Sequence, residues 1–300
     1  MLSRSVLSRR RALLRGGALL LGGPIAGQSL SAADGGSPVL RFGAVTDVHY
    51  ADKEARGTRH YRESTGKLGA ALRYLESRQP RFVVELGDLI DRTESVEDEI
   101  SFLRRIEEVY SSVSCDRHYV FGNHCIDTLT KDEFLENSGA VAPHYSFDEG
   151  PFHFVVLDSC YRSDGTPYGR NNADWKDCNI PGEQIDWLTA DLKQTSRPTI
   201  VFAHQRLDGE GAHFVNNAAE VRHVLAESGK VLAVLQGHSH KNEYHEVDGI
   251  HFCTLVAVVE GSGTEQNGAS LVSLYEDGSI RIEGFLRQQD HEFAAPTPAA

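Results

Sequence analysis

Residues 39–49 read Val-Leu-Arg-Phe-Gly-Ala-Val-Thr-Asp-Val-His, an apolar run that stops at Thr46-Asp47. Such a run predicts a buried strand whose carboxyl end meets a loop. The same form recurs along the chain, where further apolar runs are followed by Gly87-Asp88, Gly122-Asn123, His204 and Gly237-His238. Each of these strands therefore delivers polar residues at its carboxyl end.

Amphipathic stretches that predict helices separate these strands, at residues 61–77, 96–112, 182–194 and 217–228, the last with Asn216 as its expected N-cap. Because strand and helix alternate, we expect an α/β fold with ligands gathered where the strands end.

Shorter apolar runs pair around turns at Glu149-Gly150, Asp248-Gly249 and Asp277-Gly278, and these are typical of antiparallel hairpins. We expect the hairpins to form a second sheet that packs on the first. The chain then forms one folded domain over residues 38–288 and ends in a flexible tail over residues 289–300, of which 294–300 are rich in Pro and Ala.

The composition is that of a globular protein, with 40% hydrophobic and 24% charged residues in a chain of 300 and a net charge of −13. An acidic chain argues against a nucleic-acid polymer as the main partner. It does not exclude a small phosphorylated substrate, because bound cations can reverse the field where the anion sits. Nothing in the sequence specifies an oligomeric state.

The N-terminus has the form of an export signal. Paired arginines in residues 8–11 precede an apolar run at residues 18–26, and Ser31-Ala32-Ala33 follows. This order resembles a twin-arginine signal. We expect residues 1–33 to be a cleaved signal peptide that exports the protein to the periplasm or the medium and leaves no stable membrane span. A retained membrane anchor and a disordered basic tail are the alternatives.

Five cysteines are scattered without a Cys-x-x-Cys pair, and their odd count leaves at least one unpaired in a monomer. We therefore expect no disulfide framework. A bridge between Cys160 and Cys178 across a long loop remains open.

The polar residues at the strand ends form an ordered set of motifs. These are Asp47-x-His49, Gly87-Asp88-x-x-Asp91, Gly122-Asn123-His124, an isolated His204 and Gly237-His238-x-His240. Carboxylate, amide oxygen and imidazole are ligands suited to Mn, Fe or Zn. Alone, each fragment has a plain alternative as a turn, a helix cap or a core histidine. Together and in this order they predict a metal site.

In these motifs the chain resembles the calcineurin-like metallophosphoesterase family over residues 40–285. The resemblance implies a four-layer α/β/β/α sandwich, in which helices flank two sheets, with a centre of two divalent or trivalent ions at one edge. It assigns Asp47, His49, Asp88 and His240 to one ion and Asp88, Asn123, His204 and His238 to the other, so that Asp88 bridges. Two cations about 3.5–4 Å apart turn a bridging water into hydroxide for in-line attack on phosphorus.

His124 follows the ligand Asn123 and would lie near the leaving-group oxygen, where an imidazolium can donate a proton. The resemblance implies that Asp91 orients His124 and keeps it charged. The alternative for Asp91 is the N-cap of the helix that follows. Many relatives carry an acidic residue where this chain has Cys125, which removes one possible acidic neighbour of His124.

Residues 50–62 look like the corresponding segment of the manganese-dependent ADP-ribose/CDP-alcohol diphosphatase branch. There Arg59 or Arg62 could clamp a second phosphate while Tyr61 stacks on a base. The alternative is a solvated first turn of a helix.

Residues 159–180 form a long stretch without periodicity, which is typical of a lid or binding loop. Arg170 and Trp175 are its candidates for substrate recognition, unless they only pack the loop. His213, His223, His245 and His251 match no motif, and we interpret them as structural or surface residues.

The sequence therefore predicts a dinuclear-metal-dependent phosphohydrolase that acts on a nucleoside-diphosphate-linked small molecule. A broad phosphomonoesterase or phosphodiesterase with the same centre is the first alternative. A metal-binding module without activity is the second.

Overall fold

The computed structural model describes residues 36–295. The chain divides into two units, residues 1–35 and residues 36–300, and only the second contains described residues. The expected signal peptide at residues 1–33 lies outside the described part of the chain, as do residues 296–300.

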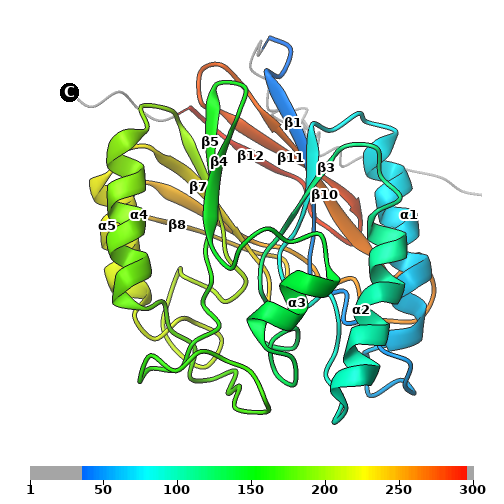
Figure 1. Cartoon of the computed structure of the whole chain (residues 1–300). Helices are drawn as coiled ribbons and strands as arrows, with labels where there is room; N and C mark the ends of the chain where they lie inside the picture. Colours follow the sequence, from blue (N-terminus) through cyan, green and yellow to red (C-terminus); the bar gives the residue numbers. More distant parts are fainter. Residues whose placement is uncertain (1–35, 296–300) are drawn as a thin grey trace, which may run out of the picture. The chain divides into compact units, whose positions relative to one another are not determined.

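Two six-stranded mixed sheets form the centre of the described unit (Figure 1). The first has the order β12-β11-β10-β1-β2-β3 and the second the order β4-β5-β6-β7-β9-β8. The strands of the first sheet are β1 (Leu40–Val45), β2 (Phe82–Glu85), β3 (Asp116–Tyr119), β10 (Gly268–Leu274), β11 (Ile280–Leu286) and β12 (His291–Phe293). Those of the second are β4 (Tyr145–Glu149), β5 (Phe152–Val156), β6 (Thr199–Phe202), β7 (Val231–Gln236), β8 (Glu243–Val247) and β9 (Ile250–Thr254).

Helices flank the two sheets and complete the predicted four-layer sandwich. They are α1 (Ser64–Glu76), α2 (Val96–Tyr110), α3 (Lys131–Asn137), α4 (Gly182–Gln194) and α5 (Ala218–Glu227), and a 3₁₀ turn, η1 (Tyr61–Glu63), precedes α1. In Figure 1, α1 and α2 lie beside the first sheet and α4 and α5 beside the second. Strands such as β2, β5, β6 and β7 are buried on both faces, which explains why they read as unbroken apolar runs.

The hairpins do not make a sheet of their own, and that expectation was wrong. The β10–β11 hairpin pairs antiparallel with β1, while β9 pairs in parallel with β7. Each sheet therefore combines parallel strands with hairpin strands. An apolar hairpin can satisfy its backbone hydrogen bonds on any open strand edge, so its local sequence does not specify which edge it joins.

Several details differ from the sequence prediction. The first sheet continues past residue 288, because His291–Phe293 form β12 and pair with β11, so this part of the expected tail is a strand. The N-cap of α5 is Asn217 and not Asn216, whose amide donates to Asp177. The short helix α3 was not expected, although Thr130 and Glu133 form a capping box at its start.

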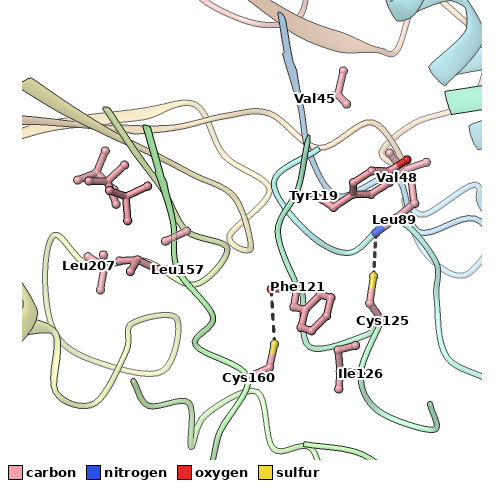
Figure 2. Close-up of a cluster of buried hydrophobic side chains, with 14 of the residues drawn as sticks. Val45, Val48, Leu89, Tyr119, Phe121, Cys125, Ile126, Leu157, Cys160 and Leu207 are labelled. Carbon is pink, nitrogen blue, oxygen red and sulfur yellow. Dashed lines mark hydrogen bonds between the residues drawn. The ribbon is translucent and has the colours of Figure 1, made fainter. Parts of the chain in front are cut away.

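All five cysteines are free, so Cys160 and Cys178 do not form a bridge. Figure 2 shows two of them in the core, where the sulfur of Cys125 accepts from the backbone N–H of Leu89 at 3.2 Å and Cys160 lies beside the carbonyl of Phe121. Cys125 is thus a packed core residue. None of the helices within residues 36–295 is long and apolar enough to cross a membrane.

Candidate metal centre

The predicted ligands lie in the loops that follow strands of both sheets. Asp47 and His49 follow β1, Asp88 follows β2 and Asn123 follows β3, whereas His204 follows β6 and His238 and His240 follow β7. The carboxyl ends of parallel strands meet at one edge of a sheet, and the two sheets present these edges to each other. Residues from five segments of the chain are brought together in this way.

The backbone at this edge is strained. The left-handed region, with positive φ, is occupied by Asp47 (53°), His49 (46°), Asp88 (63°), His238 (69°) and His240 (59°). A residue with a Cβ pays about 1–2 kcal/mol there. Strained residues gather where a function requires their geometry, so this concentration marks a functional site.

One group of ligand atoms comes from Asp47, His49 and His240. The Nε2 atoms of His49 and His240 lie 3.1 Å apart, and Oδ1 of Asp47 lies 3.2 Å from His240 Nε2 and 3.6 Å from His49 Nε2. A second group comes from Asp88, His204 and His238. The Oδ2 atom of Asp88 lies 3.1 Å from His204 Nε2 and 3.5 Å from His49 Nε2, so this carboxylate stands between the two groups.

These residues fit two cations. Oδ1 of Asp47, Oδ1 of Asn123 and Nε2 of His238 are buried without a hydrogen-bond partner, which is costly unless an ion satisfies them. The convergent set of carboxylate, amide and imidazole donors suits Mn, Fe or Zn. Neither group contains a thiolate.

The electrostatics keep Asp47, Asp88 and His238 in the forms that bind metal. Burial opposes protonation of His240, but Asp47 and Glu260 raise its pKa to about 9, so a cation has to displace a proton there. Burial opposes ionisation of Asp47, but the neighbouring His240 and His49 hold its pKa well below the usual range. The same balance with His204, His124 and His49 lowers the pKa of Asp88. Burial, together with His204, lowers the pKa of His238 and keeps its imidazole neutral. Ionised carboxylates and neutral imidazoles are the species that coordinate cations.

Two outer hydrogen bonds orient the ligand imidazoles. Nδ1 of His240 lies 2.6 Å from Oε1 of Glu260, and Nδ1 of His204 lies 2.9 Å from the carbonyl of Leu86. Each bond leaves Nε2 to face the site. Glu260 lies in the loop after β9 and belongs to no motif, so the sequence analysis missed it.

Asp91 and His124 are paired beside the ligands, Oδ1 of Asp91 meeting Nδ1 of His124. Burial would raise the pKa of Asp91, but His124 and His49 lower it far below the usual range, so the carboxylate is ionised. Asp91 is not the N-cap of α2, because Ser95 has that role and accepts from the N–H of Asp98. The backbone N–H of His124 donates to Oδ1 of Asp88 at 2.7 Å, which ties the imidazole to the metal centre.

Two hollows adjoin the centre and share Arg59 and His124. The metal hollow, of about 150 Å³, is lined by Arg59, Asp88, Asn123, His124, Trp175, His213, His238 and His240. The basic hollow, of about 240 Å³, is lined by Lys53, Glu54, Arg56, Arg59, Tyr61, Asp91, Arg92 and His124. Of the predicted recognition residues, Arg59 and Trp175 therefore stand at the site.

The other recognition candidates make contacts of their own. Tyr61 borders the basic hollow, but its side chain is only 4% exposed and packs with Ala51, Ala257 and Val259, while Lys53 covers its ring. It offers no free face for a base. Arg62 is paired with Asp52 and Glu54 and lines neither hollow.

Arg170 likewise packs its loop, because it binds Glu133 and the carbonyl of Thr128. His213, which we interpreted as a structural or surface residue, lies in the metal hollow, with its ring centroid 5.1 Å from that of Trp175 and 5.5 Å from that of His238. Lys53, Arg56 and Arg92 were also missed, because none belongs to a recognisable motif.

The fold and the paired ligand groups define a hydrolase of phosphate esters or anhydrides that depends on two metal ions. Residues 40–242 match the calcineurin-like phosphoesterase family. The chain belongs to this family.

Known proteins resemble the chain over most of its length. It is 24% identical over 314 residues to the manganese-dependent ADP-ribose/CDP-alcohol diphosphatase of Xenopus laevis, covering 81% of this chain and 87% of the relative. The protein of the same name from Oryza sativa subsp. japonica is 25% identical over 272 residues, covering 74% and 84%. A dimetal phosphatase from Danio rerio superposes with a TM-score of 0.76 at 22% identity, covering 86% of this chain and all of that one, which shows the shared fold.

Proposed function

We propose that the protein hydrolyses the phosphoanhydride bond of a small molecule linked to a nucleoside diphosphate. The observation that carries this proposal is the basic hollow beside the metal centre. Lys53, Arg56, Arg59 and Arg92 line it, against the two carboxylates of Glu54 and Asp91. Asp91 is already engaged with His124 and with Nζ of Lys53, the latter at 2.5 Å. Arg92 is held by Asp127 at 2.9 Å, so Arg56 and Arg59 remain to bind a second phosphate by charge-assisted hydrogen bonds.

The metal hollow offers an apolar wall for the nucleoside. Trp175 is 39% exposed and lies beside His213, so an aromatic surface faces the ligands from the side of the second group. A base can stack on such a surface. The names of the Xenopus laevis and Oryza sativa relatives support a substrate with two phosphates joined by an anhydride.

The roles of the residues follow from their positions. When bound, two cations supply a hydroxide nucleophile and neutralise charge on the phosphoryl oxygens. Asp47, His49, Asp88, Asn123, His204, His238 and His240 would hold them. His124 borders both hollows, so it can donate a proton to the oxygen that leaves between the two phosphates. Asp91 keeps that imidazole oriented.

The proposal is tested by a substrate screen with Mn²⁺, Fe²⁺ or Zn²⁺, comparing ADP-ribose, CDP-choline, AMP and p-nitrophenyl phosphate. Cleavage of the first two to two monophosphates supports it. Release of phosphate from AMP without cleavage of ADP-ribose would identify the broad phosphomonoesterase instead. Metal binding without turnover of any of these compounds would identify the module without activity.

Arg56→Ala tests the second-phosphate site directly. Arg56 borders the basic hollow but not the metal hollow, so we expect kcat/KM for ADP-ribose to fall about 10-fold or more, as for loss of a charged hydrogen bond. Turnover of p-nitrophenyl phosphate should stay unchanged. Arg62→Ala is the matched control from the same segment, because Arg62 is paired away from the site. An equal loss on both substrates would contradict the proposal.

We also propose that the protein is exported through a twin-arginine signal, on the basis of its first 33 residues. Replacing Arg9, Arg10 and Arg11 together by Lys should retain the protein in the cytoplasm of the producing cell. Cell fractionation measures this. Unchanged distribution of the variant would contradict the signal.

A further inference from the structure

Lys67 is a fully buried lysine of α1 that contacts the loop between β9 and β10. Its Nζ donates to the carbonyls of Val258 at 3.2 Å, Val259 at 3.2 Å and Glu260 at 3.1 Å, and it also meets the carbonyl of Gly261. The partners of this ammonium are thus consecutive backbone carbonyls rather than a carboxylate.

Consecutive carbonyls normally point in different directions, so they converge on one atom only where the chain curls around it. Burying an ammonium without hydrogen bonds is costly, and the converging carbonyl dipoles offset that cost. Conversely, without the ammonium the carbonyls of Val258, Glu260 and Gly261 would lose their donor, whereas that of Val259 also accepts from the N–H of His60. The conformation of residues 258–261, which we name the carbonyl loop, therefore depends on Lys67.

The carbonyl loop contacts one of the two ligand groups at two points. Its Glu260 lies 2.6 Å from Nδ1 of His240. Its Val259 N–H donates to the carbonyl of Asp47 at 3.0 Å. A shift of this loop would therefore reach both a ligand side chain and the backbone of a second ligand.

We propose that Lys67 is a positioning residue for the metal centre, which holds Glu260 against His240 by ordering the carbonyl loop. A carboxylate on the second nitrogen of a ligand histidine fixes its tautomer and ring orientation, and loss of such a partner weakens metal binding about 10–100-fold. The inference rests on the metal centre and not on the identity of the substrate. A failed substrate screen would leave it standing.

The experiment compares Mn²⁺ binding by the full-length chain and by Lys67→Met, which retains an unbranched apolar stem of similar size but removes the ammonium. Calorimetric titration should give a dissociation constant raised about 10-fold or more. The rise in Tm that Mn²⁺ causes should shrink in parallel. Lys230→Met is the matched control, because Lys230 also donates to a backbone carbonyl, that of Leu192, but lies before β7 at the strand's amino end.

A second variant separates positioning from folding. Glu260→Gln leaves Lys67 and its carbonyls in place, and we expect it to weaken Mn²⁺ binding by a similar factor. If Lys67 acts through Glu260, the double variant should bind Mn²⁺ about as tightly as Glu260→Gln alone, since the effects of coupled residues are not additive. Independent, multiplying effects would overturn the proposal. Two further results would overturn it. One is a Lys67→Met variant that has a lower Tm but an unchanged affinity for Mn²⁺. The other is a normally folded Glu260→Gln variant with an unchanged affinity for Mn²⁺.

Discussion

At the scale of single residues, Asp88 connects the parts of the site. Its Oδ2 faces His49 and His204, which belong to different ligand groups, and its Oδ1 accepts from the backbone of His124. One side chain therefore touches both proposed ion positions and the proposed acid. The burial that makes this carboxylate costly is offset by the surrounding imidazoles.

Asp88→Asn should abolish tight binding of the metal pair, because it removes the one negative charge shared between the two groups. We expect activity to fall at least about 100-fold, in line with loss of a metal ligand or its support. Metal analysis of the purified variant and its turnover of p-nitrophenyl phosphate measure the effect. Asp191→Asn is the control, since Asp191 binds His153 and Ser146 instead. Full activity of Asp88→Asn with a normal metal content would refute the bridging role.

His124→Ala should lower turnover by about 100–10,000-fold on substrates whose leaving group needs a proton. The loss should be much smaller on p-nitrophenyl phosphate, whose phenolate leaves without one. Mn²⁺ affinity should remain close to that of the unaltered chain, because the His124 side chain is not among the assigned ligands. Equal losses on good and poor leaving groups would contradict a role as general acid.

At the scale of elements, the loops after the strands pack so closely that glycine is required at two turns. A Cβ on Gly122 would lie 2.2 Å from the backbone nitrogen of Asp88, and one on Gly237 would lie 2.1 Å from Oγ1 of Thr46. The loop after β3 thus presses on the end of β2, and the loop after β7 presses on the end of β1. Close packing of loops from both sheets is what brings the ligand groups into contact.

Gly122→Ala should therefore reduce both stability and Mn²⁺ binding, because the backbone of Asp88 has to move. We expect a loss of about 1–3 kcal/mol, as for an overpacked core position. Gly66→Ala in α1 is the matched control, since nothing lies within 4 Å of the added Cβ. It should stabilise the protein by about 0.5–1 kcal/mol. Urea unfolding with and without Mn²⁺ distinguishes the two variants. Unchanged stability and unchanged Mn²⁺ binding in Gly122→Ala would show that the loop is packed less closely than described.

At the scale of the whole described unit, an apolar layer joins the two sheets. Phe42 and Phe82 of the first sheet stack at 4.9 Å and meet Phe154 of the second edge to face. His118 of β3 belongs to the same contact, because its ring stacks on Phe147 of β4 with centroids 3.7 Å apart. Burial lowers the pKa of His118 from 6.5 to about 4.

This histidine should make the sheet packing sensitive to acid. Because its pKa is lower in the folded than in the unfolded state, the unfolded chain binds more protons between pH 6.5 and about 4, and stability falls as the pH falls through that window. The shift corresponds to about 3 kcal/mol at most. We expect the free energy of unfolding of His118→Phe, measured with urea between pH 7.5 and pH 5, to lose this part of its pH dependence. The control His223→Gln, which replaces an exposed histidine, should retain it. An unchanged slope in His118→Phe would contradict the assignment.

Much of the fold and of the candidate site could be predicted from the sequence. Apolar runs located the parallel strands, and the helix predicted at residues 182–194 has the bounds of α4. The ligand motifs stand directly after their strands, so strand position alone placed Asp47 and Asp88 at one edge of the first sheet and His204 at the corresponding edge of the second. Hydrophobic periodicity and residue order are local signals, and they carry this information without knowledge of long-range contacts.

Tertiary structure alone decided which sheet the hairpins join and which polar residues surround the ligands. Arg62 and Arg170 were predicted at the site but are held by Glu54 and Glu133, while His213 reached the metal hollow without a motif. The contacts of Lys67 span more than 190 residues of sequence. Pairing of this kind depends on which charges and carbonyls meet after the sheets have packed. A polar side chain has several possible partners, and the residues next to it in the sequence do not specify which of them it will bind.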